Sequence, residues 1–139
     1  MLHRDGKKKN DINLGKWIGI GGKFEENESP DECIRREVFE ETGLSPSEFT
    51  FRGIVTFCQD DGETEYMHLF TAKTETRETT ECTEGTLAFV PINDVFSLPL
   101  WEGDRVFLRL LKEDVPPFLL KLVYQKDRLI RVILNGKEQ

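Results

Sequence analysis

The chain has 139 residues, of which 37% are hydrophobic and 32% are charged, so its composition is unlike that of a disordered chain. This length can bury one core, and we expect a single domain over residues 1–139. The net charge of −7 repels polyanions, which argues against a nucleic acid polymer or a membrane surface as partner.

The first predicted elements are a loop, a short strand and a helix. Residues 1–14 are polar and basic and lead into an alternating, strand-like segment at 17–20. A helix start follows at 29–32, where a serine can cap the helix, a proline suits its first turn and a glutamate completes a capping box. We expect this helix to end near Gly43.

Two paired strands, a polar connection and a further strand are predicted next. Alternating apolar residues indicate strands over 49–57 and 66–72, joined across a turn at 60–62. Residues 73–83 are rich in Thr and Glu and suit a solvated connection, which is followed by a strand-like segment at 86–90.

The last part of the chain predicts a helix and two strands. Apolar residues recur at helical spacing over 104–111, and the proline pair at 116–117 blocks any continuation. Strands are predicted over 118–124 and 129–134, joined at 126–127. The mixed order of elements, without internal repeats, predicts an α/β (α+β) fold.

The cysteine spacing and the hydropathy of the chain indicate its cellular location. The three cysteines, at positions 33, 58 and 82, have neither CxxC spacing nor histidines at zinc-ligand spacing, so we expect neither disulfides nor a zinc site. A reducing, cytoplasmic location is therefore expected. No apolar run is long enough to cross a bilayer, and the N-terminus does not resemble a signal peptide.

Three carboxylates share one face of the predicted helix. Glu37, Glu40 and Glu41 stand at i, i+3 and i+4, so their side chains fall within an arc of roughly 100°. Like charges at this spacing destabilise a helix slightly and call for solvation or a bound cation. Oxygen-only clusters suit Mg²⁺, which would also allow a small anionic substrate to bind an acidic protein. A solvated glutamate-rich face is the alternative, and the spacing alone leaves both open.

The residues around these glutamates form a longer pattern. Gly22 is followed after five residues by Glu28, and after seven more by the run Arg36-Glu37-Val38-Phe39-Glu40-Glu41-Thr42-Gly43-Leu44. This segment matches every fixed position of the Nudix box, and the chain resembles a Nudix hydrolase. The resemblance implies an α/β/α sandwich around a mixed sheet. In the family, a first strand comes before the segment that Met1-Leu2-His3-Arg4 resembles. We therefore expect that strand to be absent, or replaced by another segment or subunit.

The resemblance also assigns roles within the box. The helix glutamates would bind Mg²⁺ or Mn²⁺ together with one backbone carbonyl, and a glycine permits such a close approach. In the family the arginine of the box pairs with its earlier glutamate and holds the loop over the helix, so both support the site. The implied metal ligands are Gly22, Glu37, Glu40 and Glu41, and the supporting pair is Glu28 and Arg36.

Further similarity points to a substrate. Residues 15–23 and 100–104 are similar to parts of MutT-type enzymes, which destroy oxidised purine nucleoside triphosphates such as 8-oxo-dGTP. By this resemblance Trp101 would stack on the base and Asp104 would read its edge, with a buried core tryptophan as the alternative. Ile18 stands where animal members place a polar base-reading residue, which leaves the base selectivity open.

Residues outside the box complete the expected site. Glu84 matches a position where these enzymes often place an extra metal-binding or base-activating carboxylate. Lys23 is expected to contact phosphate, with a solvated loop lysine as the alternative. His68, in an apolar strand, is expected to pack rather than to take part in catalysis.

The implied reaction is metal-dependent hydrolysis of a nucleoside triphosphate to the monophosphate and pyrophosphate. Bound metal would neutralise phosphate charge and lower the pKa of the attacking water, and Glu37, Glu41 or Glu84 would accept the proton of that water. ADP-ribose, a dinucleoside polyphosphate or another nucleoside diphosphate derivative is an alternative substrate, because the box binds only the shared pyrophosphate. A non-catalytic nucleotide-binding module is a further alternative. We expect a small nucleotide as the binding partner, and a monomer or homodimer.

Overall fold

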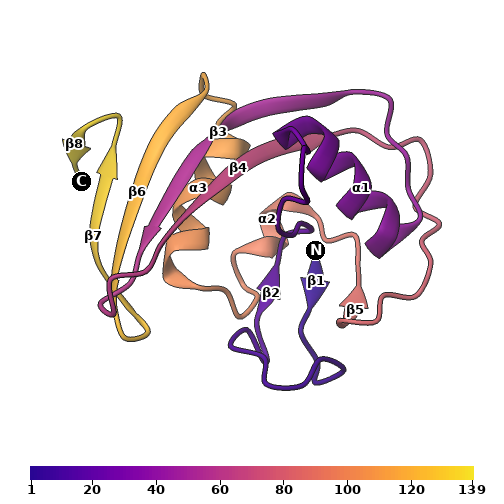
Figure 1. Ribbon diagram of the computed structural model, residues 1–139, viewed down its shortest axis with the longest axis horizontal. Coiled ribbons are helices and arrows are strands. Elements are labelled where there is room, and N and C mark those ends of the chain that lie inside the picture. Colours follow the sequence, from indigo (N-terminus) through magenta and orange to yellow (C-terminus); the bar gives the residue numbers. More distant parts are fainter. The chain divides into compact units, whose positions relative to one another are not determined.

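Two β-sheets and three helices make up the computed structural model, which describes residues 1–139 (Figure 1). This mixture of elements confirms the predicted α+β class. Contacts divide the chain into two compact units, one of Met1–Phe49 with Ala72–Leu100 and the other of Thr50–Thr71 with Trp101–Gln139. One domain over residues 1–139 stays a prediction. In chain order the elements are β1 (Leu2–His3), β2 (Trp17–Ile18), α1 (Pro30–Thr42), β3 (Phe49–Cys58), β4 (Thr64–Ala72), β5 (Thr86–Leu87), α2 (Ile92–Val95), α3 (Glu102–Lys112), β6 (Phe118–Gln125), β7 (Arg128–Leu134) and β8 (Lys137–Glu138).

The first unit contains a small antiparallel sheet in the order β2-β1-β5 (Figure 1). Leu2 is its centre, because it pairs with Ile18 on one side and Leu87 on the other and is only 1% exposed. The prediction of a loop over residues 1–14 is therefore wrong at Leu2–His3. A two-residue strand is too short to produce an alternating pattern, so hydropathy could not reveal it.

Helix α1 forms as its sequence predicts. The Ser29 hydroxyl accepts a hydrogen bond from the Glu32 backbone N–H at 3.4 Å, and the Glu32 carboxylate accepts one from the Ser29 N–H at 3.1 Å. At the other end Gly43 adopts a left-handed φ of 76° and donates its N–H to the Phe39 carbonyl. These caps fix both ends of the helix, so the positions of the residues between them are well defined.

The second unit contains a five-stranded mixed sheet in the order β4-β3-β6-β7-β8 (Figure 1). Strands β3 and β6 run parallel, whereas β6, β7 and β8 pair antiparallel. Helix α3 packs on this sheet through Phe107, as its helical apolar spacing predicts. The buried core consists of Val55, Phe107, Phe118, Leu120, Leu122 and Tyr124.

Several element boundaries differ from the predictions. The strands predicted at 17–20 and 86–90 end at Ile18 and Leu87, because only two residues of each pair with β1. Helix α2 and strand β8 were not predicted, since a single helical turn and a two-residue strand carry no periodic signal. These short elements change the connections but not the fold class.

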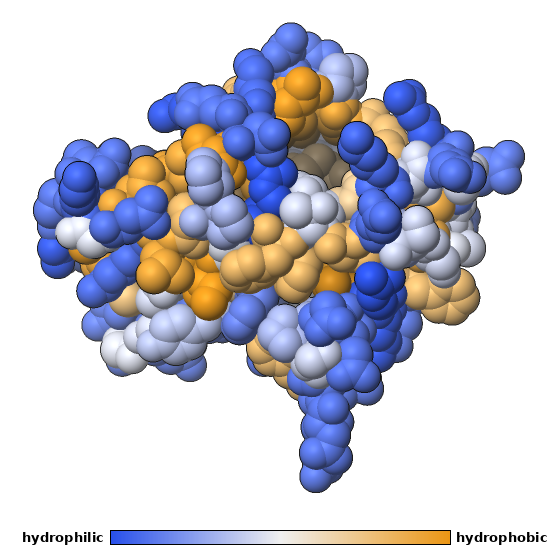
Figure 2. Space-filling model, turned by 90° about the horizontal axis from the view of Figure 1, so that it is seen from above, coloured by the Kyte–Doolittle hydropathy of each residue, from blue (hydrophilic) through white to orange (hydrophobic).

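The surface carries both polar and apolar side chains. On the face drawn in Figure 2, hydrophobic residues lie in patches among hydrophilic ones. The large exposed hydrophobic side chains include Phe39 at 59% and Leu119 at 63%. None of the helices combines the length and the apolar character needed to cross a membrane.

Candidate active site

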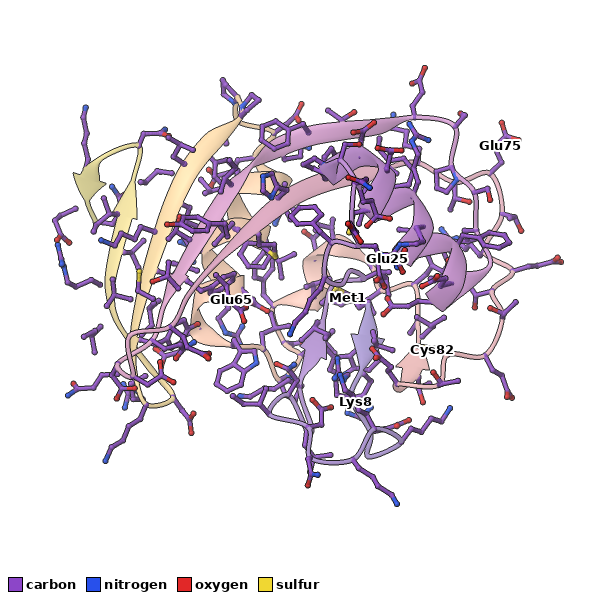
Figure 3. All side chains as sticks on the ribbon, in the orientation of Figure 1. Met1, Lys8, Glu25, Glu65, Glu75 and Cys82 are labelled. Carbon is purple, nitrogen blue, oxygen red and sulfur yellow. The ribbon has the colours of Figure 1, made fainter.

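A cavity in the first unit, hereafter the glutamate cavity, collects the acidic residues of α1. Because of their helical spacing, Glu37, Glu40 and Glu41 present their carboxylates together. The segment that precedes β5 closes the cavity, and its Cys82 is labelled in Figure 3. The volume is about 280 Å³, and the lining residues are Glu37, Glu40, Glu41, Glu81, Cys82, Thr83 and Glu84.

Glu41 is a partly buried residue of this cavity. Its Oε2 atom is buried and has no hydrogen-bond partner. Burial, followed by the negative charges of Glu84 and Glu37, raises the pKa of Glu41 to about 7. An acidic oxygen that is buried and unpaired costs free energy, which a bound cation would offset.

Gly22 lies directly against the carboxylate of Glu37. A Cβ atom at position 22 would stand 2.3 Å from Glu37 Oε1 and 2.7 Å from Oε2, well inside contact distance. The absence of a side chain therefore leaves the room that the Glu37 carboxylate fills. At the adjacent Gly21 a Cβ would meet nothing within 4 Å, so only the second glycine is required by this packing.

Arg36 binds the loop and the helix glutamates at once. Its guanidinium makes a two-pronged pair with Glu28, with Nε 2.7 Å from Oε2 and Nη2 3.0 Å from Oε1. Its Nη1 also donates to Glu37 at 2.8 Å and to Glu40 at 3.1 Å. Nη2 further donates to the Lys23 carbonyl at 3.0 Å, which ties the loop before α1 to the helix. The arginine thus supports the loop and also neutralises two carboxylates of the cavity.

The Glu28–Arg36 pair predicts a specific pH dependence of stability. Hydrogen bonds from Arg36 lower the pKa of Glu28 from 4.5 to about 2. The pair therefore contributes its full stability above pH 4.5, and this contribution is lost as the pH falls from 4.5 towards 2. We expect the Tm of Glu28→Gln to lie below that of the wild type at neutral pH, with the difference shrinking at acid pH.

Circular dichroism melts across this pH range would measure the effect. Glu26→Gln is the matched control, because Glu26 is exposed in the same loop. A Tm difference between Glu28→Gln and wild type that is constant down to pH 2 would contradict the assignment.

The donor set fits a hard divalent cation. No three His, Cys, Asp or Glu side chains are arranged as a group that could hold a metal ion, and Arg36 contacts two of the glutamates instead. The buried Oε2 of Glu41, which has no hydrogen-bond partner, and the Glu37 carboxylate beside Gly22 are nevertheless oxygen donors of the kind that Mg²⁺ and Mn²⁺ prefer.

Glu84 lies between the acidic cavity and two basic side chains. It lines the glutamate cavity, and its negative charge helps to raise the pKa of Glu41. On its other side, its carboxylate is 3.8 Å from Arg4 Nη1 and 3.6 Å from Lys8 Nζ. Glu81, Arg4 and Lys8 were not predicted to lie near the site. The three consecutive lysines from Lys7 were the available signal, but nothing in the sequence placed that loop beside Glu84.

The remaining predicted site residues are not among those that line the glutamate cavity. Lys23 is exposed, and its backbone carbonyl serves Arg36. Trp101 and Asp104 belong to the second unit, where they stand at the start of α3. Trp101 is half-buried and meets Tyr124 edge-on, with ring centroids 6.3 Å apart. His68 lies partly buried in β4.

Comparisons with known proteins show which family the chain is similar to. A family model described as NUDIX domain matches residues 1–111. The Nudix hydrolase YvcI of Bacillus subtilis (strain 168) is 36% identical over 95 residues, which make up 65% of this chain and 60% of that protein. The oxidized purine nucleoside triphosphate hydrolase of Danio rerio is 32% identical over 108 residues, or 76% of this chain and 69% of that protein. The crystal structure of the MutT protein from Bacillus halodurans matches with a TM-score of 0.80 and 26% sequence identity, covering 87% of this chain and 83% of that one.

Proposed function

Because the chain belongs to the Nudix family of hydrolases, which cleave phosphoanhydride bonds, we propose that it hydrolyses a nucleoside triphosphate to the monophosphate and pyrophosphate. Members of this family act on small nucleotides and generally use divalent metal ions. For this chain we propose Mg²⁺, with Mn²⁺ as a substitute, and an oxidised purine such as 8-oxo-dGTP as substrate. The observation that carries the proposal is the glutamate cavity with its unpaired, buried Glu41 oxygen.

The side chains of α1 would hold the metal. Glu37, Glu40 and Glu41 line the cavity from α1, and Glu84 lines it from the segment before β5. The carbonyl of Gly22 would be the remaining donor. Bound Mg²⁺ supplies charge neutralisation for the phosphate chain and lowers the pKa of a water molecule. Arg36 must release Glu37 and Glu40 for these carboxylates to bind a metal, and its two bonds to Glu28 keep it beside the helix when it does so.

A carboxylate must also accept the proton of the attacking water. Glu37, Glu41 and Glu84 all line the cavity and can do so. Burial and the negative charges of Glu84 and Glu37 raise the pKa of Glu41 to about 7. In its deprotonated form, this carboxylate would accept the proton of the attacking water.

The choice of an oxidised purine rests on relatives and on one pair of side chains. The Danio rerio protein named above is an oxidized purine nucleoside triphosphate hydrolase. We assign Trp101 as the stacking surface for the base and Asp104 as the acceptor for its edge, because an aromatic plane beside a carboxylate suits a purine. Lys23 is assigned to phosphate, since its exposed ammonium follows Gly22 directly.

A nucleotide panel tests this proposal. The wild-type chain would be supplied with 8-oxo-dGTP, dGTP, ADP-ribose and a diadenosine polyphosphate, and the products would be separated by chromatography. We expect 8-oxo-dGTP to give the highest kcat/KM and Trp101→Ala to reduce the preference over dGTP. Preference for ADP-ribose or the dinucleotide would remove the base assignment, and tight nucleotide binding without turnover would indicate a non-catalytic binding module.

A further inference from the structure

The loop between β1 and β2 is a fixed structure. Arg4 is 5% exposed, and its guanidinium makes a two-pronged pair with Asp11 at 2.7 and 2.9 Å. The Arg4 backbone N–H donates to the Lys16 carbonyl at 3.0 Å, and the Arg4 carbonyl accepts from the Gly15 N–H at 2.7 Å. Because a buried pair and backbone bonds close its base, this loop presents its exposed side chains from a defined position.

Three consecutive lysines occupy this loop, and they differ in their contacts. Lys7 Nζ donates to the Gly85 carbonyl at 3.4 Å. Lys8, labelled in Figure 3, has its Nζ 3.6 Å from Oε1 of Glu84. Lys9 is exposed and makes no such contact. Lys7 and Lys8 therefore face the segment that closes the glutamate cavity, whereas Lys9 does not.

Lys8 is the cation beside the cavity that is most available to a ligand. Arg36 is bound to Glu28, Glu37 and Glu40. The side chain of Arg4 is only 6% exposed and is committed to Asp11, whereas that of Lys8 is 47% exposed. The 3.6 Å separation between Lys8 and Glu84 is an ion pair but too long for a good hydrogen bond, so the ammonium keeps its three donors.

The electrostatics of the cavity call for such a cation. Five of its lining residues are glutamates and none is basic. A substrate that carries several phosphate charges would approach a wall that is itself negative, and metal ions held by α1 would neutralise only the phosphates bound to them. An ammonium on a flexible stem at the Glu84 side can bind the phosphates that extend beyond the metal.

We propose that Lys8 binds the phosphate chain of the substrate beside Glu84 and so selects ligands with a terminal pyrophosphate group. This inference rests on the proposed function, because it places the phosphate chain in the glutamate cavity. Lys8 exchanges its ion pair with Glu84 for a charge-assisted hydrogen bond to phosphate oxygen. The exchange also frees the Glu84 carboxylate to face Glu41 and the metal.

Binding of Mg²⁺-pyrophosphate, measured by calorimetry, tests the role of Lys8 without requiring turnover. We expect Lys8→Met to weaken binding about tenfold, as the loss of one charge-assisted hydrogen bond would. The matched control Lys9→Met removes the same charge from the same loop and is expected to bind pyrophosphate like the wild type. With 8-oxo-dGTP, Lys8→Met should raise KM by a similar factor and leave kcat nearly unchanged.

The outcomes separate this inference from the proposed function. Lys8-dependent binding of pyrophosphate by a chain that hydrolyses no nucleotide would uphold the phosphate contact and reject the proposed function. Equal weakening in Lys8→Met and Lys9→Met would overturn the inference, because it would reflect net charge alone. It would also be overturned if Lys8→Met lowered kcat at constant KM, or if the wild type bound no pyrophosphate.

Discussion

Replacing Glu40 or Glu41 by glutamine is expected to lower kcat/KM for a nucleoside triphosphate about a thousandfold. Each change keeps the shape of the side chain but replaces a carboxylate of the glutamate cavity by a neutral amide, which is a much poorer ligand for Mg²⁺. The two side chains differ in environment, since that of Glu40 is 56% exposed whereas Glu41 has a buried, unpaired oxygen. If the two substitutions lower activity equally, the common cause would be loss of a metal ion that both carboxylates bind, because the two side chains pack in different environments.

Stability should distinguish loss of a ligand from loss of the fold. The metal-free Glu41→Gln variant is expected to melt no lower than the wild type, because burial and two neighbouring carboxylates already disfavour its charge. Glu48→Gln is the control for surface charge, as Glu48 is exposed beyond the end of α1. Near-normal rates in both Glu40→Gln and Glu41→Gln would refute the assignment of the site.

Gly22→Ala is expected to lower kcat/KM by about a hundredfold while changing the Tm only slightly. The added Cβ would stand 2.3 Å from Glu37 Oε1, so the carboxylate must move away. Glu37 is a flexible side chain at this point, and its displacement costs little folding free energy. Its oxygen nevertheless leaves the position that a metal ion requires, and a ligand misplaced by about an ångström loses most of its effect.

Gly21→Ala provides a control that differs by one position. A Cβ at Gly21 meets nothing within 4 Å, and the backbone of neither glycine is left-handed. Activity and Mn²⁺ affinity, measured by electron paramagnetic resonance, should be nearly unchanged in Gly21→Ala and reduced in Gly22→Ala. Equal effects in the two variants would mean that the loop tolerates no side chain, and that the contact with Glu37 is not the reason.

The sequence predicts best those parts of the molecule whose signals are local. The capping residues Ser29 and Glu32 fix the start of α1 and Gly43 fixes its end, so the helical phase of its glutamates follows from the sequence alone. Helix α3 and the strands β3, β4, β6 and β7 are also predicted from the sequence, because their periodic patterns of apolar residues are long enough to recognise.

The rest depends on contacts between distant segments. Strand β1 owes its existence to partners at Trp17–Ile18 and Thr86–Leu87 rather than to its own two residues. Likewise, Lys8 lies next to Glu84 only because Arg4 and Asp11 close the loop that carries it. The bonds from Arg36 to Glu37 and Glu40 were also not predicted, since an arginine at that spacing has several partners within reach.

The central claim is that the α1 glutamates hold a divalent ion on which phosphoanhydride hydrolysis depends. The most direct test is the rate of pyrophosphate release from 8-oxo-dGTP by the wild-type chain, measured from excess EDTA to saturating Mg²⁺. We expect no release in EDTA, a saturable rise with Mg²⁺, and one pyrophosphate for each monophosphate formed. Release that is independent of Mg²⁺ would contradict the claim, and release of orthophosphate in place of pyrophosphate would contradict the proposed products.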